Sequence, residues 1–440
     1  MSSRPSADPG GPRRVAVLGS TGSVGTQALD VLAAHPDEFR VVALAAGSNG
    51  DLLAEQAARF GVPAGATALG ADGERLAAIA AADDIDLVVV ATGGIISLRP
   101  VLAALAAGKV VATANKETLV AGGHLVMPLA RALASARTER DRGDPLASPL
   151  AWLRPIDSEH SAIWQCLVGE PLARVASLVL TASGGPFLDH PADLSTVTPA
   201  QALRHPTWSM GAKITIDSAT LANKGLEVVE ARWLYDVADD AIEVVVHPQS
   251  VVHSAVRFVD GSLKAQLGTP DMRTPIQYAL TFPDRRPSPS AAVDLVAAGR
   301  LDFRAPDEGR FPALRIAREA GRMGQRATTA LIAADDIAVA RFLEGSLGFM
   351  GIPGVGVGLT AKIRVTLNTP APVGGTVVTL ASSNTGVFTV APGSVLIPQG
   401  FTQDSVVVTG VSVGAGTLEA RVLPSSVGMV VAQAVSCRHE

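Results

Sequence analysis

The sequence predicts an α/β protein with a parallel, doubly wound sheet in its N-terminal part and an all-β module at its C-terminal end. Four short apolar runs, at residues 15–18, 40–46, 86–90 and 109–113, alternate with stretches of helical composition. That order is typical of a parallel sheet covered by helices. After residue 353 the chain changes to short alternating runs separated by Gly, Pro, Asn or Asp. A chain of 440 residues is long for one hydrophobic core, so several domains are expected.

The composition narrows the class of protein. A net charge of −5 provides no basic surface for nucleic acid, and no run approaches the roughly 18 uninterrupted apolar residues of a membrane span. Residues 1–13 are polar, lack the apolar segment of a secretion signal, and are expected to be a disordered lead-in. Cys166 and Cys437 form neither a disulfide framework nor a metal-ligand spacing. These features predict a cytoplasmic protein.

A glycine-rich turn follows the first apolar run. Residues 19–25 read Gly-Ser-Thr-Gly-Ser-Val-Gly, and a helical pattern continues to Leu32. Strand, glycine turn and helix in this order indicate a dinucleotide site of the Rossmann type, because glycines let a pyrophosphate approach the backbone and the helix N-terminus supplies donors. The spacing is less common than Gly-x-Gly-x-x-Gly, so a tight turn without a ligand is the alternative.

The end of the second apolar run indicates which dinucleotide is bound. NAD sites usually place an acid there to accept from the ribose 2′-hydroxyl. Residues 46–49 are Ala-Gly-Ser-Asn, with no acid to repel a 2′-phosphate, so NADP(H) is favoured, although Asp51 is close. The runs at 86–90 and 109–113 end in Gly, Asn and Lys residues at the same predicted sheet edge, where ligands bind.

Three carboxylates in the middle of the chain predict a metal site. Asp157 and Glu159 alternate, so both would project to one side of an extended segment, and Glu227 from a helix would close the site. Such oxygen ligands suit Mg²⁺ or Mn²⁺ and leave positions open for substrate oxygens. The alternative is that all three are solvated surface acids, the usual place for Asp and Glu.

Groups suited to a phosphate lie near these acids in the sequence. Residues 181–186 follow an apolar run and combine hydroxyls with a glycine turn, which suits phosphate oxygens; an ordinary turn is the alternative. Ser218, Asn223, Lys224 and Glu227 fit a helical spacing, so one helix face could meet a phosphorylated, metal-chelating substrate. A solvent-facing Lys–Glu pair is the alternative.

Trp208 lies between Pro206 and Gly211, in a polar segment. We interpret this segment as a loop that closes over a substrate. A tryptophan buried in the core is the alternative.

Nine short motifs occur in an order that resembles the 1-deoxy-D-xylulose 5-phosphate reductoisomerase family, from about residue 14 to residue 353. They are Gly-Ser-Thr-Gly-Ser-Val-Gly at 19–25, Ala-Asn-Lys-Glu at 114–117, Asp-Ser-Glu-His at 157–160, Ser-Gly-Gly-Pro-Phe at 183–187, His-Pro-Thr-Trp-Ser-Met-Gly at 205–211, Asp-Ser-Ala-Thr at 217–220, Asn-Lys-Gly-Leu-Glu at 223–227, His-Pro-Gln-Ser at 247–250 and Pro-Asp-Met-Arg at 270–273. So many motifs in register make a chance match implausible.

The resemblance implies roles for individual residues. The implied NADPH contacts are Thr21, Gly22, Ser23, Val24, Gly47, Ser48, Asn49, Asn115, Glu117 and Gly211. The implied metal ligands are Asp157, Glu159 and Glu227. The implied substrate contacts are Lys116, Ser158, Glu159, Ser183, His205, Ser218, Asn223, Lys224 and Glu227. The implied catalytic residues are Lys116, Glu159, Glu227, His205 and Trp208.

The resemblance also implies an activity. A carbon-skeleton rearrangement of 1-deoxy-D-xylulose 5-phosphate, followed by hydride transfer from NADPH, would give the isoprenoid precursor 2-C-methyl-D-erythritol 4-phosphate. The metal would be Mg²⁺ or Mn²⁺, or else Co²⁺. The partner would be a small phosphorylated sugar, with no nucleic acid or membrane, and the oligomer a homodimer.

The expected domains follow from the resemblance and from the change after residue 353. They are an NADPH-binding Rossmann-like domain at 14–153, an α+β catalytic domain at 154–286, a truncated helical domain at 287–353 with helices over 311–322 and 328–342, and a β-sandwich at 354–440 that resembles a bacterial immunoglobulin-like module. Its expected strands are 363–367, 376–380, 387–390, 395–397, 405–409 and 417–422. Residues 138–149 are expected to be a neutral surface insertion.

Two other functions fit parts of the sequence. An NADP-dependent semialdehyde dehydrogenase would need a thiol nucleophile, and Cys166 is the candidate, although its amphipathic surroundings favour a place in the core. A catalytically impaired fusion whose β-rich tail binds a surface partner is the second alternative. A secretion signal would favour this alternative, and none is visible in the sequence.

Overall fold

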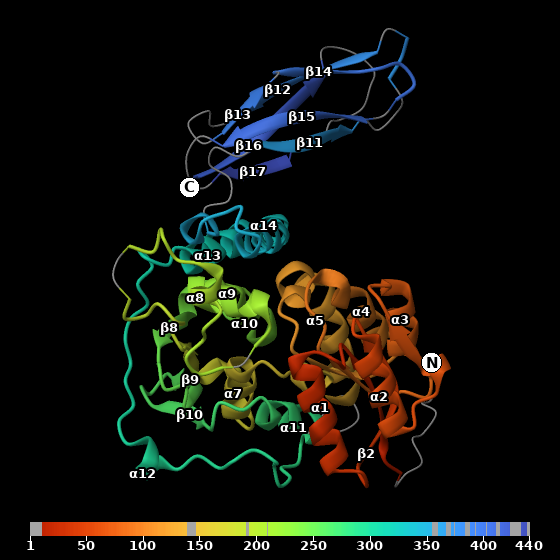
Figure 1. Ribbon diagram of the computed structural model, residues 1–440, viewed down its shortest axis with the longest axis vertical. Coiled ribbons are helices and arrows are strands. Elements are labelled where there is room, and N and C mark those ends of the chain that lie inside the picture. Colours follow the sequence, from red (N-terminus) through yellow and green to blue (C-terminus); the bar gives the residue numbers. More distant parts are fainter. Residues whose placement is uncertain are drawn as a thin grey trace. The chain divides into compact units, whose positions relative to one another are not determined.

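The structure is a computed structural model that describes residues 11–138, 147–190, 193–208, 210–353, 360–366, 371–373, 375–382, 388–391, 393–401, 403–410, 414–422 and 433–437. The chain forms two compact units, Met1–His190 with Leu203–Ile332, and Pro191–Ala202 with Ala333–Glu440 (Figure 1). Most of the predicted lead-in, of the insertion at 138–149 and of the glycine-rich stretch after Pro353 lies outside the described residues.

A six-stranded parallel sheet begins the first unit. Its order is β3-β2-β1-β4-β5-β6, the doubly wound topology that the sequence predicts. The strands are β1 (Arg13–Leu18), β2 (Phe39–Ala46), β3 (Thr67–Leu69), β4 (Leu87–Val90), β5 (Val110–Thr113) and β6 (Leu153–Pro155). All four predicted runs form strands, whereas β3 and β6 were not predicted. Because β6 belongs to this sheet, it crosses the domain boundary expected at 153/154.

Helices connect these strands. They are α1 (Ser23–Ala34), α2 (Gly50–Phe60), α3 (Gly73–Ala81), α4 (Leu98–Ala106), α5 (Glu117–Thr138) and α6 (Pro149–Trp152). In α1 the buried apolar residues are Ala28, Leu29, Val31 and Leu32, which recur at helical spacing. The helix therefore packs one face on the sheet and leaves its N-terminus at the carboxyl edge of β1.

Helix α5 is long and apolar. Among the described residues it alone has the length and composition of a possible membrane span, and half of that segment is buried inside the protein. It packs against α4 and α10, and a Cβ at Gly123 would lie 2.4 Å from the Trp233 ring. These contacts are those of a helix in a protein core.

A second, mixed sheet follows in the same unit, in the order β10-β9-β7-β8. Its strands are β7 (Val175–Ala182), β8 (Ile242–Val246), β9 (Val252–Phe258) and β10 (Leu263–Leu267). The associated helices are α7 (Ser158–Leu167), α9 (Ala212–Thr220), α10 (Ala222–Tyr235) and α11 (Arg273–Thr281). The predicted α+β character of this part is confirmed, with α7 packed on β9 and β10 (Figure 1).

The remaining helices are α8 (Pro199–Ala202), α12 (Leu295–Ala298), α13 (Ala313–Met323) and α14 (Gln325–Leu343). The two helices predicted after residue 311 are therefore present. Helix α13 packs closely on α10, because a Cβ at Gly225 would lie 2.5 Å from Cβ of Ala317. The first unit ends at Ile332, and the finer division at 286/287 stays a prediction.

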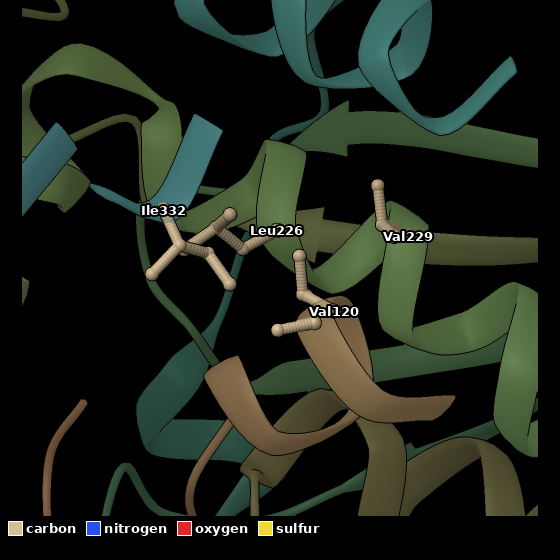
Figure 2. Packing of buried hydrophobic residues seen from close by; sticks show 5 residues of the cluster. Val120, Leu226, Val229 and Ile332 are labelled. Atoms are coloured by element: carbon tan, nitrogen blue, oxygen red, sulfur yellow. The ribbon is translucent and has the colours of Figure 1, made fainter. Parts of the chain in front are cut away.

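A buried cluster joins α5, α10 and the start of α14. Val120, Leu226, Val229 and Ile332 contact one another there, with Ala121 as the fifth member (Figure 2). The Thr328 hydroxyl also donates to the Val120 carbonyl oxygen at 2.8 Å. This cluster fixes α10, which carries much of the site described below, against α5.

Two antiparallel sheets make up the β-rich part of the second unit, in the orders β11-β15-β13 and β14-β12-β16-β17. Their strands are β11 (Thr360–Thr366), β12 (Thr376–Ser382), β13 (Phe388–Ala391), β14 (Ser394–Ile397), β15 (Gln403–Gly410), β16 (Gly414–Val422) and β17 (Gln433–Cys437). All six predicted strands are present and β17 is an addition. The all-β prediction is confirmed, whereas the immunoglobulin-like resemblance stays a prediction.

Candidate active site

A cavity of about 470 Å³ in the first unit contains most of the predicted site residues. Its lining comes from α1, from the ends of β5 and β7, from the segment that contains His205 and Trp208, from α9, and from the N-terminal parts of α7, α10 and α11. The predicted residues that line it are Ser23, Val24, Lys116, Asp157, Ser158, Glu159, Ser183, His205, Trp208, Gly211, Ser218, Asn223, Lys224 and Glu227. The other predicted cofactor residues do not line this cavity.

The three predicted metal ligands converge in the cavity. Asp157, Glu159 and Glu227 each offer an oxygen, and these atoms lie within 4.8 Å of one another. The expectation that Asp157 and Glu159 lie on an extended segment is wrong. Asp157 is the N-cap of α7, where its Oδ1 accepts from the backbone N–H groups of Glu159 and His160, and Glu159 is in the first turn.

Two buried lysines compensate the three acids. The Lys116 ammonium donates to Asp157 Oδ2 and lies 3.8 Å from Glu227 Oε1. The Lys224 ammonium donates to Glu227 Oε2 and, at 3.0 Å, to Glu159 Oε1. With all three acids ionised, the two ammonium groups would leave this set one negative charge, which suits a divalent cation.

The environment separates the pKa values of two of these acids. Burial raises the pKa of Glu227, and repulsion by Asp157 and Glu159 adds to this effect, so its value is about 8 despite the two lysines. Burial also acts to raise the pKa of Asp157, but Lys116, His160 and Lys224 outweigh it and hold that pKa well below its usual range. Glu227 is fully buried, so a cation bound here would have to replace its proton.

A hydroxyl–imidazole cluster forms a neighbouring wall of the cavity. His205 Nε2 lies 2.9 Å from Ser183 Oγ and 3.1 Å from Ser218 Oγ. The other ring nitrogen, Nδ1, accepts from the backbone N–H groups of Thr207 and Trp208. Burial lowers the pKa of His205. An imidazole whose Nδ1 is an acceptor carries its proton on Nε2, so His205 and the two serines can all donate to an anion.

The glycine turn after Ser183 fits closely against α9. Gly184 and Gly185 have φ of +86° and +66°, and a Cβ at Gly185 would lie 2.9 Å from the Ser218 carbonyl oxygen. Only glycine permits both this backbone conformation and this approach. The turn therefore brings Ser183 next to Ser218, which lies far from it in sequence.

The predicted single helical spacing from Ser218 to Glu227 is wrong. Ser218 lies on α9, and Leu221, with φ of 62°, separates this helix from α10. The spacing holds within α10, where the Asn223 amide donates to Glu227 Oε1 at 2.6 Å. All four residues still line the cavity, because the break occurs beside it.

Trp208 is partly exposed and lines the cavity, so it is not a buried core residue. Its ring centroid lies 6.2 Å from that of His253, which in turn lies 3.3 Å from the Thr269 carbonyl oxygen through Nε2. His253 was not predicted. Ser209, within the same segment, lies outside the described residues. Closure of this loop stays a prediction.

The glycine turn of the first sheet is shaped for close backbone approach. Gly19 has φ of +87°, and a Cβ at Gly25 would lie 2.1 Å from the Gly19 carbonyl oxygen. Gly22 caps α1 without a side-chain acceptor, and Gly22 and Ser23 are exposed. The turn therefore offers helix N-terminal N–H groups to a diphosphate.

Two predicted cofactor residues have side chains committed to local structure. Asn49 accepts from the Leu52 N–H as the N-cap of α2. Asn115 donates to the Thr92 and Gly94 carbonyl oxygens and accepts from Thr118. Any cofactor contact of these residues would therefore involve mainly their backbone. Gly47, Ser48 and Asn49 are exposed beyond β2, and no acid occurs among them.

The cavity also contains residues that were not predicted. Gln27 and Asp30 of α1 line it, and so do Pro270, Met272 and Arg273 at the start of α11. The Pro-Asp-Met-Arg motif is the sequence signal that could have identified Pro270, Met272 and Arg273. No sequence feature pointed to Gln27 or Asp30.

Cys166 is buried, and burial raises its pKa to about 11, so it is a core thiol rather than a nucleophile.

The fold and this cavity define an enzyme of the dinucleotide-dependent oxidoreductase class, with a carboxylate cluster suited to a divalent cation. The sequence profile of 1-deoxy-D-xylulose 5-phosphate reductoisomerase matches residues 15–68 and 64–123. The profiles of its C-terminal domains match residues 153–235 and 267–366. The chain belongs to the 1-deoxy-D-xylulose 5-phosphate reductoisomerase family, as predicted.

Individual relatives agree with this assignment. The 1-deoxy-D-xylulose 5-phosphate reductoisomerase of Pelotomaculum thermopropionicum is 48% identical over 363 residues, covering 78% of this chain and 90% of that protein. The enzyme of Moorella thermoacetica is 49% identical over 360 residues, covering 77% and 89%.

Solved structures of the family have the same fold. The Zymomonas mobilis enzyme in complex with NADPH matches with a TM-score of 0.68 at 39% identity, covering 78% of this chain and 89% of that one. A DOX-P reductoisomerase in complex with NADPH, fosmidomycin and magnesium matches with 0.69 at 40% identity, covering 78% and 87%.

Proposed function

We propose that this protein converts 1-deoxy-D-xylulose 5-phosphate into 2-C-methyl-D-erythritol 4-phosphate, using NADPH and a divalent metal ion. The observation that supports this most is one cavity that combines three converging carboxylates with a cluster of anion-binding donors. Relatives with this name are identical at about half of the aligned positions, and a solved relative is a complex with NADPH and magnesium.

Asp157, Glu159 and Glu227 would hold the metal ion, since three oxygen ligands within 4.8 Å suit Mg²⁺, Mn²⁺ or Co²⁺. When bound, the ion supplies Lewis-acid polarisation of the substrate's carbonyl and hydroxyl oxygens. Lys116 and Lys224 keep the surrounding carboxylates in place through their ion pairs. Ser158, whose hydroxyl donates to Glu159 Oε2 at 2.6 Å, orients that ligand.

The phosphate group would bind to Ser183, Ser218, Asn223 and Lys224. The Ser183 and Ser218 hydroxyls flank His205, which adds an Nε2–H of its own. A phosphate held there lies beside the metal ligands, because Asn223 and Lys224 contact Glu227 directly. This juxtaposition suits a short sugar phosphate whose other end chelates the metal ion.

The cofactor would lie along the carboxyl edge of the first sheet. Its diphosphate would contact Thr21 to Val24, and its 2′-phosphate the acid-free segment Gly47 to Asn49. Asn115, Glu117 and Gly211 would line the path toward the substrate. Trp208 would close over the bound substrate and exclude water.

The family resemblance also suggests an oligomeric state and a cellular location for this protein. We expect a homodimer, and β10, an edge strand of its sheet among the described residues with largely exposed side chains, offers one free edge for self-association. We expect a cytoplasmic location. Light scattering and cell fractionation test these two points.

The experiment that tests the proposed function follows NADPH oxidation by the purified protein. Oxidation should require both 1-deoxy-D-xylulose 5-phosphate and Mg²⁺ or Mn²⁺, and EDTA should abolish it. NADH should be a poor substitute. Turnover without metal, or a preference for NADH, would contradict the proposal.

A further inference from the structure

A buried imidazole–carboxylate pair lies next to the carboxylate cluster, outside the cavity lining. His160 and Glu230 are 0% and 2% exposed in their side chains, and His160 Nε2 lies 3.1 Å from Glu230 Oε2. Packing alone does not explain the pair, because well-packed apolar residues of similar volume are often at least as stabilising as a buried ion pair. The position of the pair suggests another role.

His160 and Glu230 each lie about one helical turn beyond a proposed metal ligand on the same helix, farther from the cavity. His160 follows Asp157 by three residues in the first turn of α7, and Glu230 follows Glu227 by three residues in α10. Residues three apart lie on the same helix face. The two helices therefore present Asp157 and Glu227 to the cavity and pair His160 with Glu230 behind them.

His160 is in turn tied to the first turn of α7. Its backbone N–H donates to Asp157 Oδ1 at 3.3 Å, beside the Glu159 N–H at 3.1 Å. Its carbonyl oxygen accepts from the Tyr235 hydroxyl at 2.6 Å, at the far end of α10. A shift of His160 would therefore move the turn that carries two of the three carboxylates relative to the helix that carries the third.

We propose that Glu230 is a positioning residue for the metal site. It holds His160, and through it the first turn of α7, at the distance from α10 at which Asp157, Glu159 and Glu227 converge. This inference rests on the proposed function, because it concerns the same carboxylates. Loss of a direct partner of a metal ligand typically weakens metal binding by about 10- to 100-fold; Glu230 acts through His160, whose N–H contacts Asp157, so the lower end of this range is expected.

The test measures Mn²⁺ binding by electron paramagnetic resonance, without substrate or turnover. Glu230→Gln removes the charge at constant volume and should weaken Mn²⁺ binding about tenfold or more, with NADPH affinity unchanged. Glu230→Asp keeps the charge but shortens its reach and should give an intermediate affinity. Asp239→Asn is the matched control, because Asp239 is a buried acid paired with Arg318 and Arg322; it should lower the melting temperature but leave Mn²⁺ affinity unchanged.

A double variant tests whether Glu230 acts through His160. The pair His160→Gln with Glu230→Gln should bind Mn²⁺ no more weakly than the weaker single variant, whereas additive losses would overturn the coupling. Wild-type affinity in folded Glu230→Gln would overturn the proposal. Should that variant fail to fold, wild-type affinity in Glu230→Asp would do so. A wild-type protein that binds no Mn²⁺ would instead contradict the proposed function.

Discussion

The side-chain amide of Asn223 donates to Glu227 Oε1 at 2.6 Å across one turn of α10. A residue proposed to bind phosphate therefore touches a residue proposed to bind metal. The same is true of Lys224, whose ammonium contacts Glu227 Oε2. The two halves of the site are consequently coupled, and a change in one should alter the other.

Glu227→Gln should abolish turnover while NADPH binding is retained. The substitution removes one oxygen ligand and its charge but conserves the volume, so the fully buried position stays filled. Mn²⁺ binding should weaken by about tenfold or more. Calorimetric titration measures both affinities, and unchanged Mn²⁺ affinity would remove Glu227 from the ligands.

Lys224→Ala should raise the KM for 1-deoxy-D-xylulose 5-phosphate strongly. A charge-assisted contact is worth about 1.5–3 kcal/mol, which corresponds to roughly 10- to 150-fold in KM. Lys264→Ala is the control, because Lys264 is exposed and paired with Glu170. Steady-state kinetics at saturating NADPH check this, and an equal KM in both variants would show that Lys224 does not contact the substrate.

The stability of the metal-free protein should fall as the pH rises from about 5 to about 8. The pKa of Glu227 is raised to about 8 in the fold, so the native protein retains a proton that the unfolded chain has already lost above its ordinary value of 4.5. His160 acts in the same direction: burial opposes its charge, but Glu230 raises its pKa, and this stabilisation is lost as the pH rises through the folded value. Melting curves in EDTA measure the effect. Glu227→Gln should flatten the slope, and a slope identical to that of the wild type would contradict this account.

Gly25→Ala should abolish NADPH binding. The added Cβ would lie 2.1 Å from the Gly19 carbonyl oxygen, so the turn after β1 would have to move. Gly65→Ala is the control, since nothing lies within 4 Å of its added Cβ. Fluorescence titration with NADPH distinguishes them. Normal binding by Gly25→Ala would mean that the turn does not shape the cofactor site.

Deletion of residues 360–440 should leave NADPH binding intact. The deletion removes strands β11 to β17, whereas every predicted cofactor residue occurs by Gly211. Limited proteolysis of the full chain should cut within residues 351–360. Loss of NADPH binding in the shortened protein, or resistance to cutting there, would show that the β-rich part is integral to the enzyme.

Much of the first sheet was predictable because parallel strands buried on both faces appear as continuous apolar runs. Strands β3 and β6 were missed because each has only three residues and no such run. The site residues were predictable from motifs, but their local conformation was not. The alternation at Asp157 and Glu159 suggested a strand, whereas Asp157 instead accepts the free N–H groups that begin α7. The spacing of residues 218–227 does not indicate the break between two helices at Leu221. Asp30 lines the cavity only because of tertiary packing, which the sequence pattern does not show.

The most direct test of the central claim is the identity of the product. The purified protein, incubated with 1-deoxy-D-xylulose 5-phosphate, NADPH and Mg²⁺, should yield one 2-C-methyl-D-erythritol 4-phosphate for each NADPH oxidised, measured by nuclear magnetic resonance and absorbance. The branched carbon skeleton distinguishes it from the straight-chain product of simple ketone reduction. A straight-chain product, or no product from folded protein that binds NADPH and Mn²⁺, would contradict the account.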